Sequence, residues 1–278
     1  MISQPLSHID PVSLATLTSE AALLTRVDRK YLIPLDDAAA LLGTLDPRTR
    51  VLEQGGARSF AYESVYFDTV DRVSYHLAAR SRRRRFKLRS RRYVGTETAF
   101  LEMKTRGGRG VTVKERIDYQ TGNCTRLTAE GRNYSADALA GIGLDPALVT
   151  RLGPALTTRY HRSTLLASDG TRATIDTSLA WIDADGRTLK LPGWVIVESK
   201  TAGPPSAIDR SLWRAGIRPE GISKFGTGTA ALHPELSSNK WSRLLRGPFS
   251  SARIAPAALT LATPTTVSPT PLSMKDSA

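Results

Sequence analysis

Charged and apolar residues alternate along several short segments of this chain. The clearest segments are residues 86–93, 101–104 and 197–200. In the first of them, Lys87, Arg89 and Arg91 occupy every second position, and in the other two a glutamate stands two residues before a lysine. Because successive side chains of a β-strand point to opposite faces, each segment predicts a strand with its charges on one face.

Eight segments have the pattern of β-strands. They are residues 22–33, 60–67, 83–93, 98–104, 111–119, 158–167, 172–182 and 194–201. Several carry charges of both signs on one face, and a polar face repeated over many strands indicates the lumen of a closed barrel. About eight strands close into a barrel of modest bore. We therefore predict an α+β fold, mainly antiparallel, built on an eight-stranded β-barrel tunnel with peripheral helices.

Short helices are expected between these strands. They are residues 37–45, with Asp36 as the N-cap, and residues 70–79, 135–148 and 206–216. The glycine-rich run 107–110 is expected to form a hairpin turn. We expect a flexible N-terminus over residues 1–15, one domain over 16–250 and a disordered tail over 251–278. The tail is rich in Ala, Thr, Pro and Ser and buries too little apolar surface to fold.

The charge balance points to anionic partners. The chain has 278 residues with 39 Lys and Arg against 26 Asp and Glu, a net charge of +13. Its one cysteine excludes an intrachain disulfide and a cysteine-rich zinc site, and fits a reducing cytoplasm. No apolar run approaches the roughly 20 residues that span a bilayer. We expect a cytoplasmic protein, and any membrane partner would be a separate protein.

The alternating charges suit a phosphate chain and a divalent ion. Arginine presents a planar fork that matches phosphate oxygens, and lysine supplies a compact point charge. Mg²⁺ takes oxygen ligands and shares its site with substrate phosphates. Glu198 is the first metal candidate and Glu102 the second, because both lie mid-strand beside lysines. No histidine indicates a general base, but phosphoryl transfer depends mostly on positioning and charge stabilisation.

Nine short motifs, taken in order, resemble one protein family. They are residues 26–31, 66–69, 87–93, 100–104, 113–116, 159–162, 172–177, 197–200 and 223–225. Together they resemble the VTC domain, the polyphosphate polymerase domain of the vacuolar transporter chaperone complex, which also occurs in stand-alone bacterial proteins. That family belongs to the triphosphate tunnel metalloenzymes, whose fold is an antiparallel eight-stranded barrel around a basic tunnel.

The resemblance implies transfer of the ATP γ-phosphate onto a polyphosphate chain, with Mn²⁺ or Mg²⁺ as cofactor. Catalytic contacts are expected from Arg89, Arg91, Lys104 and Arg159. Phosphate-binding contacts are expected from Lys30, Lys87, Lys114, Arg116, Arg172, Lys200 and Lys224. Glu198 would bind the metal, with Glu102 as the second candidate. The expected partners are therefore ATP or another triphosphate, and polyphosphate.

Two positions depart from the family's pattern. Asp28 stands two residues before Lys30, where the family is described with a glutamate three residues before its lysine. Glu220 and Gly221 stand upstream of Lys224, where the eukaryotic polymerases carry an additional lysine. The second departure weakens the expectation of efficient polymerisation, because a cation for the acceptor chain is missing there.

Two other functions stay open. The first is a metal-dependent triphosphatase: the cyclase and thiamine-triphosphatase branch opens with Glu-x-Glu-x-Lys, and Arg26 here replaces the first carboxylate, which favours the polymerase branch. The second is a non-catalytic binder of polyphosphate or nucleic acid. Nucleic acid is not expected, since aromatic residues are only 6% and the cations alternate with carboxylates on strands.

A run of arginines at residues 80 and 82–85 is typical of a solvated face. Arg82 and Arg84 are expected to lie outside the tunnel, because they fall out of register with Arg89 and Arg91. The oligomeric state stays open.

Overall fold

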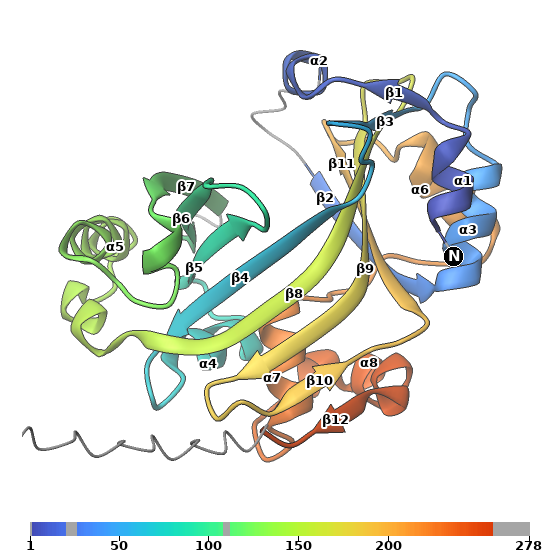
Figure 1. Ribbon diagram of the computed structural model, residues 1–278. Helices are drawn as coiled ribbons and strands as arrows, with labels where there is room; N and C mark the ends of the chain where they lie inside the picture. Colours follow the sequence, from blue (N-terminus) through green and yellow to red (C-terminus); the bar gives the residue numbers. More distant parts are fainter. Residues whose placement is uncertain (1, 21–26, 108–111, 258–278) are drawn as a thin grey trace, which may run out of the picture.

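The computed structural model describes residues 2–20, 27–107 and 112–257, which form a curled sheet flanked by helices (Figure 1). The strands are β1 Asp10–Val12, β2 Val27–Pro34, β3 Arg50–Leu52, β4 Phe60–Asp68, β5 Arg85–Tyr93, β6 Ala99–Arg106, β7 Thr112–Tyr119, β8 Gly153–Leu166, β9 Arg172–Asp183, β10 Thr188–Lys190, β11 Trp194–Thr201 and β12 Arg253–Ala255. The α-helices are α1 Ser3–Ser7, α2 Leu14–Glu20, α3 Leu35–Gly43, α4 Val73–Ala79, α5 Ala129–Gly141, α6 Ala207–Arg214, α7 Lys224–Leu232 and α8 Ser242–Arg246. The 3₁₀ helices are η1 Thr121–Asn123, η2 Pro146–Arg151, η3 Asn239–Trp241 and η4 Pro248–Ser251.

Eight of the strands form an antiparallel sheet in the order β2-β11-β9-β8-β4-β5-β6-β7. They correspond to the eight strands predicted from the sequence, so the mainly antiparallel α+β class is confirmed. The sheet does not close into the expected barrel, because no ladder joins β2 to β7 within the described ranges. Instead it curls, with the long strands β4 and β8 crossing its middle (Figure 1).

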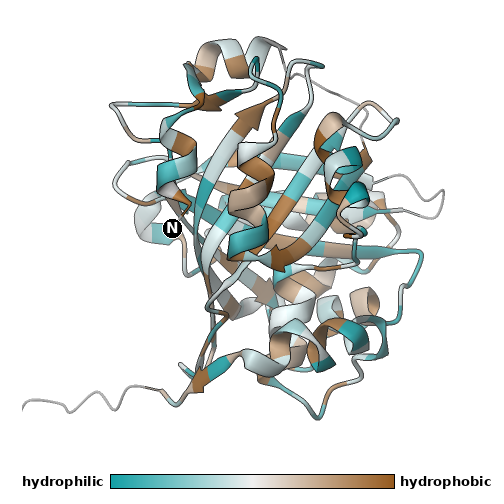
Figure 2. Ribbon diagram, turned by 90° about the vertical axis from the view of Figure 1, so that its right-hand side faces the viewer, coloured by the Kyte–Doolittle hydropathy of each residue, from teal (hydrophilic) through white to brown (hydrophobic). Residues whose placement is uncertain are grey.

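Burial of the apolar face of each strand sets the curvature and leaves the charged face on the concave side. Leu88 of β5 and Leu101 of β6 are buried beneath α5 at one end of the sheet. Val195 and Val197 of β11 pack against residues of α3 and α6 at the other end. Figure 2 accordingly shows hydrophobic and hydrophilic residues mixed along the strands. Each fully buried aliphatic side chain of this kind contributes about 1.5–3 kcal/mol.

Helix α7 packs against the concave side of the sheet and was not predicted. Phe225 stacks on Tyr66 of β4 at a centroid distance of 5.1 Å. Trp181 of β9 donates a hydrogen bond from Nε1 to the carbonyl oxygen of Lys224 at 2.8 Å. Gly228 lies so close to Trp181 that a Cβ atom there would stand 2.2 Å from the indole Cδ1. The helix therefore holds its first turn, with Lys224, against the strands.

Three predicted helices are present with different ends. The helix expected over 70–79 begins at Val73, because Thr69 and Asp68 accept hydrogen bonds from the first backbone N–H groups. The helix expected over 135–148 is α5, which begins earlier behind the N-cap Thr128. Asp36 does not cap α3, since the helix begins at Leu35 and places Asp36 inside the first turn.

Short elements near both ends of the described residues join the main body. The segment expected to be flexible, 1–15, contains α1 and β1, and Leu6 and Val12 are buried because they cover apolar parts of the sheet. The expected tail begins with β12, which pairs with β10. The rest of that tail, 258–278, and the glycine run at 108–110 lie outside the described residues. No helix in the described part is long and apolar enough to cross a membrane.

Candidate functional site

A cavity of about 210 Å³ lies on the concave face of the sheet. Nine lysine or arginine side chains and three carboxylates are among the described residues that line it. The cations are Lys30, Lys87, Arg89, Arg91, Lys104, Lys114, Arg162, Lys200 and Lys224, and the carboxylates are Asp28, Glu102 and Glu198. Cations outnumber carboxylates on this lining, which favours a ligand with several negative charges.

Strand register explains why these side chains converge. Across β5 and β6, Lys87 stands opposite Lys104 and Arg89 stands opposite Glu102. Lys114 of β7 then faces Lys104. Residues that face each other across a ladder share one face of the sheet, so the alternation read in each strand becomes one continuous charged surface.

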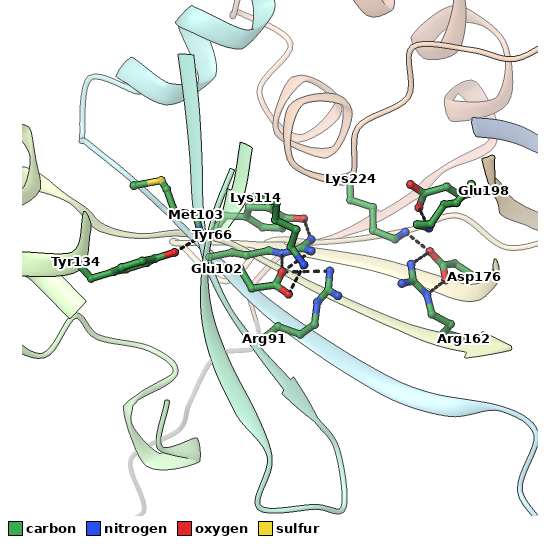
Figure 3. A network of polar contacts seen from close by, with 12 residues as sticks. Tyr66, Arg91, Glu102, Met103, Lys114, Tyr134, Arg162, Asp176, Glu198 and Lys224 are labelled. Carbon is green, nitrogen blue, oxygen red and sulfur yellow. Dashed lines mark hydrogen bonds and ion pairs between the residues drawn. The ribbon is translucent and has the colours of Figure 1, made fainter. Parts of the chain in front are cut away.

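Glu102 holds three of the cations in place. Its carboxylate lies 2.7 Å from both Arg89 Nη2 and Lys114 Nζ, and 3.6 Å from Arg91 Nη2 (Figure 3). Arg89 also donates a hydrogen bond to the Tyr66 hydroxyl at 2.8 Å. Burial would raise the pKa of Glu102, but Arg89 and Lys114 lower it to about 2. Glu102 is only 3% exposed, and its two oxygens accept hydrogen bonds from Arg89 and Lys114, so it orients these cations.

Asp176 organises the opposite wall of the cavity. Arg162 donates two hydrogen bonds to its carboxylate at 2.6 and 2.7 Å, and Lys224 Nζ contacts the same group (Figure 3). Burial would raise the pKa of Asp176, but Arg162 and Lys224 hold it below its ordinary value. Lys224 Nζ also lies 4.3 Å from the ring centroid of Tyr160. Three elements, β8, β9 and α7, are thus joined at one carboxylate.

The N-terminus of α7 adds a further favourable field for anions. Ser223 caps the helix by accepting a hydrogen bond from the N–H of Gly226 at 3.1 Å, and it lines the cavity. Lys87 Nζ donates to the Ser223 hydroxyl at 2.8 Å. Helix N-termini carry a partial positive charge, so Lys224 in the first turn adds to it rather than offsetting it.

Arg159 lies on the other face of the sheet from the cavity. Residues of β8 alternate, and Tyr160 and Arg162 take the concave side, which turns Arg159 outward. Its side chain is 60% exposed and pairs with Glu63 at 2.6 Å, a carboxylate that Arg92 shares. Arg159 thus lies outside the cavity lining, and Arg162 from the same motif lies on it.

Two other expected contacts lie beside the cavity rather than in its lining. Arg116 is exposed on β7, with its guanidinium 4.3 Å from the ring centroid of Phe100. Arg172 faces Lys200 across the ladder between β9 and β11 and shares its side of the sheet. The remaining expected phosphate contacts all line the cavity. Arg162 belongs to the motif 159–162, so the motif identified the segment of β8 that reaches the cavity, although Arg162 and not Arg159 lines it.

The model of one protein family, the VTC domain, matches residues 25–233, which is most of the chain. The chain belongs to the VTC domain family. The family predicted from the nine motifs is thereby confirmed. None of the curated proteins matches the chain.

Several solved structures are similar to this chain at low sequence identity. A protein from Hippeastrum, described as a candidate adenylyl cyclase with a dominant triphosphatase activity, is 17% identical with a TM-score of 0.47, covering 73% of this chain and 94% of that one. A candidate adenylate cyclase from Vibrio parahaemolyticus is 11% identical with a TM-score of 0.40, covering 72% and 94%. A protein from Pyrococcus horikoshii OT3 is 13% identical with a TM-score of 0.42, covering 74% and 98%.

Two carboxylates of this VTC domain are suited to a divalent ion. Glu198 faces Lys30 across β2 and β11, and Asp28 faces Lys200, so the two acids are diagonal neighbours on the cavity side. Glu198 contacts Lys30 and Lys200 only at 3.4 and 3.3 Å, whereas Glu102 receives two contacts of 2.7 Å. Burial would raise the pKa of Glu198, but Lys200 and Lys30 lower it well below its ordinary value, so the carboxylate is ionised.

No group of three or more His, Cys, Asp or Glu side chains in the described ranges forms a metal site by itself. Mg²⁺ is often bound by one or two carboxylates, with substrate phosphates and water completing its shell. Asp28 and Glu198 match that donor set beside a cavity suited to phosphates. The residues therefore fit a divalent ion whose remaining ligands are phosphate oxygens and water.

Crowding of the lysines changes their basicity. Burial, followed by the nearby charges of Lys104 and Lys30, lowers the pKa of Lys87 to about 7. Burial lowers the pKa of Lys200 to about 8, although Glu198 opposes the shift. Cations that are crowded together without enough counter-charge are stabilised by a bound anion.

Proposed function

We propose that this VTC domain transfers the γ-phosphate of ATP onto a polyphosphate chain in the cationic cavity, with Mn²⁺ or Mg²⁺. The observation that carries the proposal is the surplus of cations on the concave face, with arginines held by buried carboxylates. Donors fixed before the substrate binds need no reorganisation as charge develops, and this is the largest source of catalysis in phosphoryl transfer.

The residues have two roles: some bind the phosphates, and others orient the side chains that bind them. Arg89 and Arg162 present guanidinium forks that match phosphate oxygens, and Glu102 and Asp176 set their orientation. Arg91 Nε is buried and has no hydrogen-bond partner among the described residues, which leaves a donor for a phosphate oxygen. Asp28 and Glu198 would hold a divalent ion, which would neutralise part of the charge of the phosphates.

An ionised phosphate acceptor needs no general base, which makes transfer to polyphosphate compatible with this cavity. In the step we propose, a terminal oxygen of the polyphosphate forms a bond to the γ-phosphorus, the bond to the β-phosphate bridging oxygen breaks, and ADP leaves with the electron pair. A terminal phosphate oxygen is already ionised, so it needs no base, whereas an attacking water must lose a proton.

The test is incubation of the purified protein with ATP and Mn²⁺ or Mg²⁺, with long-chain polyphosphate and free orthophosphate measured separately. We expect metal-dependent polymer. Glu198→Gln and Arg89→Ala are expected to lower the rate by about a hundredfold or more, since each removes a group at the reacting phosphates. Arg159→Ala, on the outer face, is the matched control and is expected to stay within about twofold.

The same assay separates the alternatives. Orthophosphate without polymer would favour a metal-dependent triphosphatase, the second candidate, which uses the same cavity. Salt-sensitive binding of polyphosphate without turnover of ATP would favour a non-catalytic polyanion binder. If Arg159→Ala abolished activity and Arg89→Ala did not, the concave cavity would not be the active site.

A further inference from the structure

A second cavity of about 350 Å³ adjoins the first. The two share Lys87 and Ser223 on their linings, together with Lys30, Asp28, Lys104 and Ile222. A wall that belongs to both spaces means that a linear ligand lying in the first cavity can continue into the second.

The second cavity brings three cations that the first does not have. They are Arg85 and Arg106, at the paired ends of β5 and β6, and Lys240 in η3. Lys240 lies beyond residue 233, where the match to the VTC domain ends. Its Nζ donates a hydrogen bond to the carbonyl oxygen of Ala78 at 2.8 Å and lies 5.6 Å from the ring centroid of Trp241.

These three cations lie close enough to repel one another. Burial lowers the pKa of Lys240, and the charges of Arg85 and Arg106 lower it further. Burial and the charge of Arg106 likewise lower the pKa of Arg85. Arg85 donates a hydrogen bond to the carbonyl oxygen of Arg82 at 2.7 Å and Lys240 donates one to that of Ala78, so both of these acceptors are uncharged. A polyanion would relieve this repulsion.

The balance of charge in the second cavity agrees with that ligand. Six cations and two carboxylates line it within the described ranges, the carboxylates being Asp28 and Glu220. Outside it, Arg82, Arg83 and Arg84 are exposed on the turn that leads into β5, as the sequence predicted for Arg82 and Arg84. Positive charge therefore extends from the first cavity through the second to the surface.

We propose that Lys240, Arg85 and Arg106 form an outer subsite for a long linear polyphosphate, whose end occupies the first cavity. The subsite distinguishes a long chain from a triphosphate, because only the long chain reaches it. Lys240 thereby supplies, from outside the family's domain, an acceptor-chain cation of the kind whose absence we noted at Glu220 and Gly221. This inference rests on the proposed function in one respect, namely that the first cavity binds phosphates.

The test compares the affinity of the purified protein for tripolyphosphate and for long-chain polyphosphate. We expect Lys240→Met to weaken binding of the long chain about fivefold, as for one partly exposed charge contact, and to leave tripolyphosphate within about twofold. The slope of the logarithm of the long-chain binding constant against the logarithm of the salt concentration is also expected to become shallower, by slightly less than one unit. Lys240→Arg keeps the charge and is expected to restore the long-chain affinity.

Lys190→Met is the matched control, because Lys190 is an exposed lysine on β10 and its replacement removes the same net charge. It is expected to leave both affinities unchanged. The outer subsite would be overturned if Lys240→Met lowered the affinity for both ligands equally or for neither. It would also be overturned if Lys190→Met had the same effect as Lys240→Met. A thermal unfolding midpoint for Lys240→Met near that of the parent shows that the loss is not one of folding.

The two proposals fail in different ways. If the parent makes no polymer but Lys240→Met still weakens only the long chain, the polymerase proposal fails and the subsite stands. If the parent makes polymer and Lys240→Met binds both ligands like the parent, the subsite fails and the polymerase proposal stands.

Discussion

Arg162 on β8 and Asp176 on β9 face each other across the ladder and share two hydrogen bonds, Nε to Oδ1 at 2.6 Å and Nη2 to Oδ2 at 2.7 Å. Lys224 reaches the same carboxylate from α7. Asp176 is fully buried, and a cation taken out of water needs a counter-charge. One acid therefore holds a strand cation and a helix cation at the cavity wall.

Replacement of Asp176 by Asn should destabilise the protein and lower its activity. Breaking a buried ion pair from one side costs about 3–5 kcal/mol, because the partner charge stays buried without compensation. Loss of the orientation of Arg162 is expected to lower turnover by about ten- to a hundredfold. Urea denaturation and steady-state rates of ATP consumption measure the two effects.

Asp183→Asn separates the two effects. Asp183 is also buried and pairs with Arg187 at 2.8 Å, but neither residue lines the cationic cavity. We expect this variant to lose stability and to keep its turnover at a temperature where it is folded. If both variants lost turnover alike, the activity would follow stability and not the placement of Arg162.

Glu102 should make stability depend on pH at the acid end. Its pKa falls from 4.5 in the unfolded chain to about 2 in the folded protein, so its contribution is fully present above pH 4.5. It is lost as pH falls through about 2. The difference in unfolding free energy between the parent and Glu102→Gln is expected to shrink by about 3 kcal/mol from pH 5 to pH 2. A difference that stays constant across that range would contradict the ion pairing of Glu102 with Arg89 and Lys114.

From the sequence we could predict which charged residues of one strand share a face. We could not predict which face of the strand points into the cavity. Lys87, Arg89 and Arg91 are two apart, as are Glu198 and Lys200, so each set shares a face whatever the fold. The motif 159–162 offers an arginine on each face. Only packing decides which one is inside, and β8 also shifts its register between Arg159 and His161.

Neither helix α7 nor the degree of closure of the sheet could be predicted from the sequence, for two different reasons. Residues 224–232 contain two glycines and two threonines, whose helix propensity is low, so tertiary packing on Trp181 and Trp241 determines this helix. Closure depends on whether β2 and β7 meet across the concave face, a contact between distant segments that no local pattern encodes. The repeated polar face and the strand count predicted a closed barrel, and the described strands form a curled sheet that is compatible with a tunnel.

Lys87 should couple phosphate binding to proton uptake. Its pKa of about 7 in the free protein lies below its unfolded value, so the unfolded chain binds more protons above pH 7 and stability rises with pH up to about 10. A bound phosphate favours the ammonium form and raises this pKa again. Affinity for tripolyphosphate is therefore expected to fall as pH rises above 7. Uptake of one proton by Lys87 would lower the logarithm of the binding constant by up to one unit for each pH unit.

Calorimetric titrations of tripolyphosphate from pH 6 to 9, in buffers of different ionisation enthalpy, measure that slope. Lys87→Met is expected to make this slope shallower, with Lys200 and its pKa of about 8 supplying the remainder, while Lys190→Met keeps the whole slope. Ionisation of the ligand is common to all three proteins and cancels in the comparison. Identical slopes for the parent and Lys87→Met would show that Lys87 does not titrate with the ligand.

Gly228→Ala should displace α7 and with it Lys224. A Cβ atom at this position would stand 2.2 Å from Trp181 Cδ1 and 2.4 Å from its Nε1, and the buried indole has no room to yield. We expect a loss of about 1–3 kcal/mol in unfolding free energy, as for other overpacked cores, and weaker binding of tripolyphosphate. The control is Gly141→Ala at the end of α5, where a Cβ meets nothing within 4 Å, so stability is expected to stay the same or rise slightly. Full tripolyphosphate affinity in folded Gly228→Ala would show that the position of α7 does not control the site.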